Sequence, residues 1–224
     1  MNKIDYVVIV SSLITIGVTW IRPIDIYLIF LTHLFAVPSY YIVKDDKWLC
    51  CFLSFSVFAS LLWHFSKEDF YNEQFEQFDI VHQNLLIAIS VCLILYESIP
   101  QFILGVLFVY TIFLSIFGLN EVDGIPMYEI LTAGWIIPLF IHAPWIEKSK
   151  RIYLGILIVY SVIGVITYLI SSGDNYNMIH SIWHVCAYCS LYFSFRIAKW
   201  NRKDFRTNYD DLSERQPLNS PEDN

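Results

Sequence analysis

Residues 151–188 read RIYLGILIVYSVIGVITYLISSGDNYNMIHSIWHVCAY, and this stretch decides the fold. It contains an uncharged apolar run at 152–171, which has the roughly 20 residues that an α-helix needs to cross a bilayer. After a short polar joint, a second apolar run begins at 177. This run holds His180 and His184, one helical turn apart, in surroundings that are otherwise apolar. The stretch therefore predicts two membrane helices, the second of which carries a polar pair.

The same pattern extends over most of the chain. Of its 224 residues, 56% are hydrophobic and only 16% are charged, which is far from the composition of a water-soluble domain. Backbone groups in lipid are satisfied only within helices or closed barrels, and runs this long and continuous indicate helices. We therefore predict an all-α polytopic membrane protein. The apolar runs lie at about 6–21, 24–43, 48–65, 78–96, 100–118, 130–146, 152–171 and 177–195.

The composition divides the chain into three parts. Residues 1–23 are an N-terminal hydrophobic segment with Lys3 and Asp5 near its start, and it is either an extra helix or a signal segment. Residues 24–198 contain the other seven runs and predict a seven-transmembrane helix bundle. Residues 199–224 are charged and polar, with too little apolar surface to fold, so they predict a disordered cytoplasmic tail.

Lysine and arginine are distributed unequally between the joints. Short cytoplasmic joints are enriched in these residues, so the richer side is predicted to be the cytoplasmic side. That side receives KDDK at 44–47, EKSKR at 147–151 and the basic start of the tail, whereas the opposite side receives only Arg22 and Lys67. The C-terminus is therefore predicted to be cytoplasmic. The net charge of -7 comes mostly from joints and tail, and no nucleic-acid partner is expected.

Under this topology, four of the six histidines lie at one depth. His64 is near the outer end of its run, His82 is near the outer start of the next, and His180 and His184 lie in the first turns of the last run. Ionisable groups in a bilayer usually face the bundle interior or a water-filled cavity, where they pair or bind a ligand. One shared site is the simplest interpretation.

The residues at this depth have the pattern of a zinc site. His180 and His184 are spaced i, i+4, so both imidazoles leave one helix face, and His64 from another helix completes three ligands. Three nitrogens leave a fourth position on Zn²⁺ for water, which the metal activates for attack on a carbonyl. Asp79 is a candidate proton acceptor, and Ser60 lies one turn before His64, so both are candidate catalytic residues.

The sequence alone leaves alternatives open for these histidines. A histidine pair on a membrane helix is often engaged only in hydrogen bonds with neighbouring helices. His82 and Ser181 are candidates for holding a ligand imidazole in place, and His82 is alternatively a substitute ligand. His33 and His142, which lie within other runs, are interpreted as residues of interhelical hydrogen bonds outside this site.

This arrangement resembles the CREST superfamily of seven-helix membrane hydrolases, which includes alkaline ceramidases and adiponectin receptors. The stretches LFAVPSYYIVKDDKW at 34–48 and DNYNMIHSIWHVCAY at 174–188 are similar to its transmembrane protein 8 and myomaker branch. The resemblance covers essentially residues 24–198. The motifs that carry it are Ser60-x-x-x-His64, Asp79 at the start of the next helix, and HSIWH at 180–184.

The resemblance implies a chemistry for each of these residues. It implies that His64, His180 and His184 hold zinc and that Ser60 and Asp79 support the activated water. It further implies hydrolysis of an ester or amide bond of a membrane lipid, as in a ceramidase or a phospholipase A2.

The same resemblance implies an alternative, a myomaker-like protein that drives fusion between cells such as myoblasts, with zinc in a structural role. The presence of Ser60 and Asp79 favours catalysis, because a structural metal needs only ligands, whereas the chain length favours fusion. Membrane lipids are the expected partners, and the branch implies a homodimer. The expected location is the plasma membrane, or else a Golgi or endosomal membrane, with the metal site toward the extracellular or lumenal side.

Overall fold

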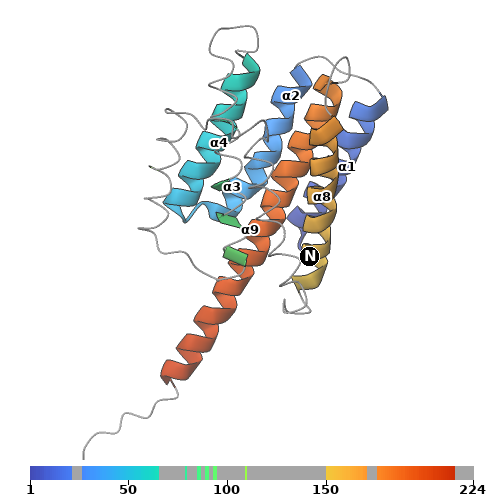
Figure 1. Ribbon diagram of the computed structural model, residues 1–224. Coiled ribbons are helices and arrows are strands. Elements are labelled where there is room, and N and C mark those ends of the chain that lie inside the picture. Colours follow the sequence, from blue (N-terminus) through green and yellow to red (C-terminus); the bar gives the residue numbers. More distant parts are fainter. Residues whose placement is uncertain are drawn as a thin grey trace, which may run out of the picture.

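The longest helix, α9 (Tyr176–Glu214), is the element against which most of the others pack. In the computed structural model, α8 (Arg151–Ile170) lies along it most extensively and α1 (Lys3–Ile21) also packs against it. Figure 1 shows α1 and α8 on one side of α9 and the remaining labelled helices toward the other side.

The second group of helices comes from residues 27–65. A bent helical segment consists of α2 (Tyr27–Thr32), the 3-10 helix η1 (His33–Ala36) and α3 (Val37–Val43), and all three pieces contact α9. Helix α4 (Lys47–Phe65) packs against α3 and η1. The bent segment therefore lies between α4 and α9 over part of their length.

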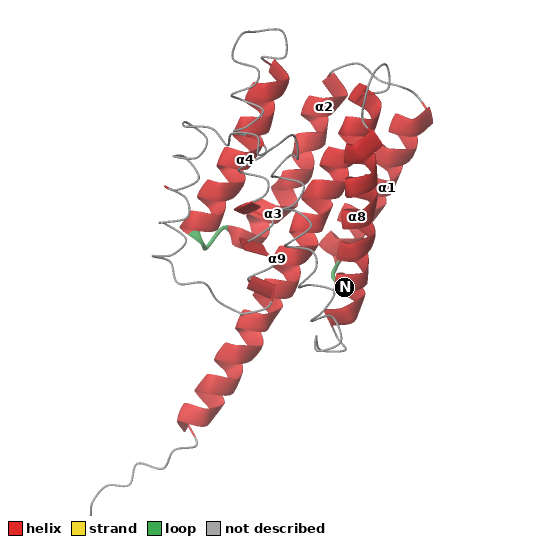
Figure 2. Ribbon diagram, in the orientation of Figure 1, coloured by secondary structure: helices red, strands yellow, loops and turns green. Residues whose placement is uncertain are grey.

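The structure describes residues 1–21, 27–65, 79, 85–86, 89–90, 93–94, 109, 150–170 and 176–214. Within this part of the chain all regular secondary structure is helical (Figure 2), so the all-α prediction is confirmed there. The described positions of the predicted run 78–96 are also helical. The runs 100–118 and 130–146 lie almost entirely outside the described residues, and with them part of the predicted seven-helix bundle.

Three of the described helices, α1, α4 and α8, are long and apolar enough to cross a membrane. The distribution of polarity in α1 is the reverse of that in a water-soluble helix, because Asp5, Ser12 and Thr19 are buried. Large apolar side chains are instead exposed on α1 and α8, which lipid would cover favourably and water would not. This distribution indicates a membrane protein. Exposed examples are Val7, Val10, Leu13, Ile14, Trp20, Val159, Ile166 and Leu169.

The residue before α4 determines where this helix begins. Asp46 precedes the helix, and its Oδ1 accepts a hydrogen bond of 3.2 Å from the Leu49 backbone N–H. An aspartate in this capping position satisfies one of the N–H groups that the first turn leaves unpaired. The helix then continues without interruption to Phe65, which places Ser60 and His64 in its last two turns.

The bend between α2 and α3 has its cause in Pro38. A proline has no backbone N–H, so it cannot donate to the carbonyl of Leu34, four residues before it. Instead the N–H of Val37 donates to the Leu34 carbonyl, which is the i to i+3 bond of a 3-10 turn. The run 24–43, predicted as one span, is therefore two short α-helices joined by a tighter turn that begins at His33.

The two ends of the chain differ in how they compare with the predictions. The segment 1–23, predicted as an extra helix or a signal segment, forms α1 and packs against α9. The predicted disordered tail begins at 199, but α9 continues as a helix through Glu214. Extending an existing helix needs no new nucleus, so polar residues can continue a helix that the buried part has already formed. Residues 215–224 lie outside the described part of the chain.

Close packing of α8 on α9 depends on a small residue. A Cβ atom added at Gly164 would lie 3.4 Å from the Cβ of Cys186 on α9, whereas one added at Gly155 would meet nothing within 4 Å. Near this point the hydroxyl of Ser161 donates to that of Ser190 at 3.2 Å. The absence of a side chain at Gly164 allows the two helices to approach each other closely.

We expect Gly164→Leu to lower the free energy of unfolding by about 1–3 kcal/mol, because the added side chain would overpack this interface. The matched control is Gly155→Leu, which faces open space and should behave like the wild type. Thermal unfolding of the purified protein in detergent would compare the two variants. Equal unfolding temperatures for both would contradict the close approach of α8 and α9.

Candidate metal centre

Three histidines meet where the last turns of α4 lie beside the first turns of α9. His64 is in the final turn of α4, and His180 and His184 follow each other by one turn on α9. All three are almost completely buried, with exposed fractions of 3%, 1% and 0%. The structure thus brings together the three residues that the sequence predicts as metal ligands.

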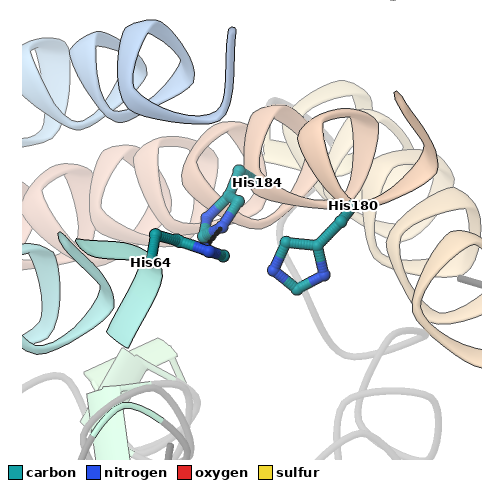
Figure 3. A group of neighbouring side chains, drawn as sticks. All are labelled: His64, His180 and His184. Carbon is teal, nitrogen blue, oxygen red and sulfur yellow. Dashed lines mark hydrogen bonds between the residues drawn. The ribbon is translucent and has the colours of Figure 1, made fainter. Parts of the chain in front are cut away.

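The three imidazoles are close enough to share one ion. One ligand nitrogen from each histidine can be chosen so that all three lie within 4.8 Å of one another. The Nε2 atoms of His64 and His184 are hydrogen-bonded at 2.9 Å. In Figure 3 the rings of His64 and His184 meet from separate helices, and the ring of His180 extends from α9 on the same side.

These separations fit a tetrahedral metal ion. Zinc binds histidine nitrogen at about 2.0 Å, so two nitrogens on one ion lie about 3.3 Å apart. The Nε2 atoms of His64 and His184 are closer together than this value, whereas the limit of 4.8 Å for the whole group is longer than it by about 1.5 Å. Rotation of the side chains would bring all three nitrogens around one central ion. The group could therefore hold a metal.

The charge state of these histidines also suits metal binding. Three imidazoles this close in a buried site cannot all be protonated, because like charges repel strongly where water is excluded. Neutral imidazole is the form that binds a metal ion. The hydrogen bond between His64 and His184 requires one of them to donate and the other to accept, which again needs at least one neutral ring.

Aromatic rings enclose the site around His180. The ring of Tyr176 stacks on the His180 ring with centroids 4.7 Å apart, and those of Trp63 and Trp183 lie at 5.3 Å and 5.0 Å. Trp63 also contacts His64, at 4.7 Å. An apolar shell of this kind limits access of water and lowers the local dielectric, which strengthens the interactions of any ion bound inside.

A fourth histidine, His33, packs against the same cluster, although it is not one of the three residues whose ligand atoms group together. Its ring centroid lies 4.6 Å from that of His184 and 6.1 Å from that of His64. His33 is 6% exposed and occupies the first position of η1, next to α9. The sequence contained a signal for this contact, since His33 and His184 lie at similar distances from the outer ends of their runs.

The predicted catalytic serine lies on the correct face of α4. Ser60 precedes His64 by one turn and is completely buried. Its hydroxyl has no hydrogen-bond partner among the residues that the structure describes. Burying an unsatisfied hydroxyl is unfavourable, so such a group next to a histidine cluster is what a site for a polar ligand would contain.

The predicted aspartate is buried within a helix. Asp79 has an exposed fraction of only 1%. On α9, Tyr188 packs against the rings of His33 and His184, with centroid distances of 5.6 Å and 6.1 Å. Tyr188 therefore forms part of the wall around the histidines.

The two other predicted site residues differ in what the structure says of them. The hydroxyl of Ser181 donates to the backbone carbonyl of Asn177 at 2.6 Å, which commits its hydrogen to its own helix. His82 lies outside the described residues, and so does His142.

Comparisons with protein-family models, with curated proteins and with solved structures find no match for this chain. The site is therefore interpreted from its own geometry and chemistry.

We expect the purified protein to contain about one zinc ion per chain and His184→Ala to contain almost none. The reason is that loss of one of three ligands removes both a bond and the pairing with His64. Ser181→Ala is the matched control, since Ser181 lies between the two α9 histidines but bonds to its own backbone. Metal analysis after purification without chelator makes the measurement. Equal metal content in all three proteins would exclude this site.

Proposed function

We propose that this protein is a zinc-binding, multi-pass membrane protein that hydrolyses an ester or amide bond of a membrane lipid. The observation that carries the proposal is the group of three buried histidines, His64, His180 and His184, with ligand atoms within 4.8 Å of one another. Two helices contribute to this group, and one turn away lies the Ser60 hydroxyl, which has no hydrogen-bond partner among the described residues. The geometry fits zinc in the three-nitrogen form that leaves a position open.

The chemistry divides between the metal and two side chains. Bound zinc would supply Lewis acidity, which polarises a carbonyl and lowers the pKa of a coordinated water to about 7. The hydroxyl of Ser60 is available to donate to a carbonyl oxygen as negative charge develops on it. Asp79 would accept a proton from the attacking water or hold that water in position. Tyr188 packs against the His184 ring and would help to hold this ligand in position.

A lipid substrate suits the surroundings of the site. The histidines are enclosed by aromatic rings, and the outer faces of α1 and α8 are apolar. A lipid can present its ester or amide carbonyl to the site while its acyl chain stays among apolar side chains. A water-soluble substrate would have to leave its hydration shell to reach the same position.

The resemblance to the CREST superfamily supports the same proposal. Its motifs coincide with the residues that meet in space, since HSIWH supplies His180 and His184, and the SxxxH motif supplies Ser60 and His64. The three-dimensional grouping is independent of the resemblance, because it follows from the positions of the side chains. We therefore assign this chain, as a proposal, to the transmembrane protein 8 and myomaker branch.

A structural role for zinc is the second candidate, and the packing of α4 favours it. Helix α4 packs against η1 and α3, whereas α9 packs against α1, α2, α3, η1 and α8. The contact between His64 and His184 joins α4 directly to α9. A metal at this point would fix the two helices relative to each other, as a myomaker-like fusion protein with structural zinc would require.

We also propose the orientation and the location. The basic joints and the start of the tail lie on the cytoplasmic side, so the C-terminus is cytoplasmic and the histidines lie toward the extracellular or lumenal side. The plasma membrane is the proposed location, with Golgi or endosomal membranes as the alternative, and the protein is proposed to act as a homodimer.

The test is release of fatty acid from ceramide, phospholipid and GPI-anchored substrates in mixed micelles. We expect the wild type to release fatty acid from at least one of them. Ser60→Ala should reduce the rate by about 10²–10³-fold, as expected for loss of a donor to a developing oxyanion. Its zinc content should stay unchanged, because Ser60 is not a ligand. Release by Ser60→Ala at the wild-type rate would contradict the role given to this hydroxyl.

A cell-mixing assay separates the two candidate functions. Cells that express the wild type and cells that express Ser60→Ala or His184→Ala are each mixed with a labelled population, and content exchange is counted. Fusion that survives Ser60→Ala but not His184→Ala, together with no fatty-acid release by the wild type, would favour the structural role. Fatty-acid release that depends on both residues would favour hydrolysis.

A further inference from the structure

A second buried polar cluster lies further along α9 than the histidines, near the middle of this helix. Its centre is Asp5 of α1, which is 0% exposed. One carboxylate oxygen accepts hydrogen bonds from the Tyr192 hydroxyl at 2.7 Å and from Arg196 Nε at 3.1 Å. The other accepts from the Tyr153 hydroxyl at 3.0 Å and from the Asn2 backbone N–H at 2.6 Å. We call these five residues the Asp5 network.

The network joins three helices through one carboxylate. Asp5 belongs to α1, Tyr153 to α8, and Tyr192 and Arg196 to α9. Each carboxylate oxygen accepts two hydrogen bonds, so its capacity is filled. Asn2 also accepts from the Asp5 N–H at 2.9 Å, which forms a reciprocal cap at the start of α1. The same residue therefore starts the helix and attaches it to its neighbours.

A second contact lies about two turns further along α1. The hydroxyls of Ser12 on α1 and Tyr160 on α8 form a hydrogen bond. Ser12 is completely buried, on the same helix face as Asp5 and Val8. The opposite face of α1 exposes large apolar residues. This helix thus shows polar side chains to the bundle and apolar ones to the outside, as a helix with lipid on one face would.

Asp5 is buried and Arg196 is partly buried, so separating α1 from the other helices would be unfavourable. A charged group in a low-dielectric interior is tolerated when its partner is present and is strongly unfavourable when the partner is removed. Without α1, the half-buried Arg196 would lose its counter-ion, and the hydroxyls of Tyr153 and Tyr192 would lose their acceptor. A signal segment that is cut off would leave these groups unsatisfied in the remaining bundle.

The network also fixes the direction in which α1 runs. Asp5 lies in the first turn of α1, and Tyr153 lies in the first turn of α8. Arg196 follows His180 by sixteen residues on α9, which is about 24 Å of helix. In Figure 1 the N-terminus lies at the end of the bundle from which the extension of α9 leaves. The start of α1 and the exit of α9 are therefore at the same end, opposite the histidines.

We propose that α1 is a permanent membrane-crossing helix and that the Asp5 carboxylate holds it against α8 and α9. The N-terminal end of α1 then lies on the same side of the membrane as the C-terminal extension of α9. The two ends of the chain then share one side, so the chain crosses the membrane an even number of times. This proposal does not depend on the bound metal or on the proposed hydrolase activity.

Topology is tested on the full chain with one epitope tag at each end. Antibody access to each tag is scored in intact cells, then after permeabilisation of the plasma membrane alone, and then after complete permeabilisation, beside a lumenal marker. We expect both tags to become accessible at the same step. Access to the two tags at different steps, or loss of the N-terminal tag by cleavage of α1, would overturn the proposal.

The role of Asp5 in holding α1 is tested by cutting the chain after α1. A protease site is inserted in the joint 22–26 of the full chain, and after cleavage in mild detergent the amount of α1 that stays with the remainder is measured. Asp5→Arg and Arg196→Asp should each reduce retention at least 5-fold, and the double exchange should restore at least half of it. Lys3→Glu is the control, since Lys3 is exposed on the same turn and should leave retention unchanged. Full retention of α1 in both single variants would contradict this role of Asp5.

A crosslink keeps the proposal testable if the charge variants fail to fold. Ser12→Cys places a thiol on the buried face of α1, which packs against α9, and the native Cys189 of α9 is a buried free cysteine, so oxidation in intact membranes should form a disulfide between α1 and α9. After cleavage in the joint 22–26, this bond should hold α1 to the remainder under denaturing, non-reducing conditions. Ser11→Cys, which starts from the neighbouring hydroxyl, is the control and should give little crosslink. Equal crosslinking at both positions, or none at Ser12→Cys, would overturn the arrangement.

Discussion

A chain embedded in lipid must satisfy its buried polar groups from within, because the surroundings offer no hydrogen bonds. This constraint explains the arrangement of polar residues in the described helices. Asp5, Ser12, Ser60, His64, His180 and His184 are all buried, whereas large apolar side chains occupy the outside. Where a buried polar group has a partner, as Asp5 has, it joins helices. Where it lacks one, as the Ser60 hydroxyl does among the described residues, it suggests a place for a ligand.

The two polar clusters give α9 different roles at two positions along its length. At its beginning, His180 and His184 meet His64 of α4 and form a group that can bind a metal. Further along, Tyr192 and Arg196 bind the carboxylate of Asp5 and attach α1. Between them, Gly164 and Cys186 bring α8 close to the same helix. One helix therefore sets the position of the candidate site and also holds the opposite end of the bundle together.

The sequence predicted the parts of this structure that depend on local pattern. Apolar runs predicted α1, α4 and α8, and the i, i+4 spacing with a matched depth predicted that His64 would meet His180 and His184. For His33 the only signal was its similar depth within its run. The 3-10 turn and the packing of η1 on α9 that bring it to the cluster are not visible in a hydrophobic pattern.

The Asp5 network was beyond sequence reasoning for a similar reason. Asp5 and Arg196 are 191 positions apart in the chain, and each looks like an ordinary charge at the boundary of an apolar run. Only the packing of α1 on α9 shows that they form a pair. A charge at the edge of a predicted span can therefore mark an interhelical contact as well as a solvated end.

The 3-10 turn in the run 24–43 does not change which face of this segment is buried. Its buried residues follow one another at the three- and four-residue steps of a helix face, and they are Thr32, His33, Ala36, Ser39, Ile42 and Val43. All three pieces of the segment contact α9, before and after the turn. The chain therefore accommodates the missing N–H of Pro38 within one turn, and the buried stripe that carries His33 stays continuous.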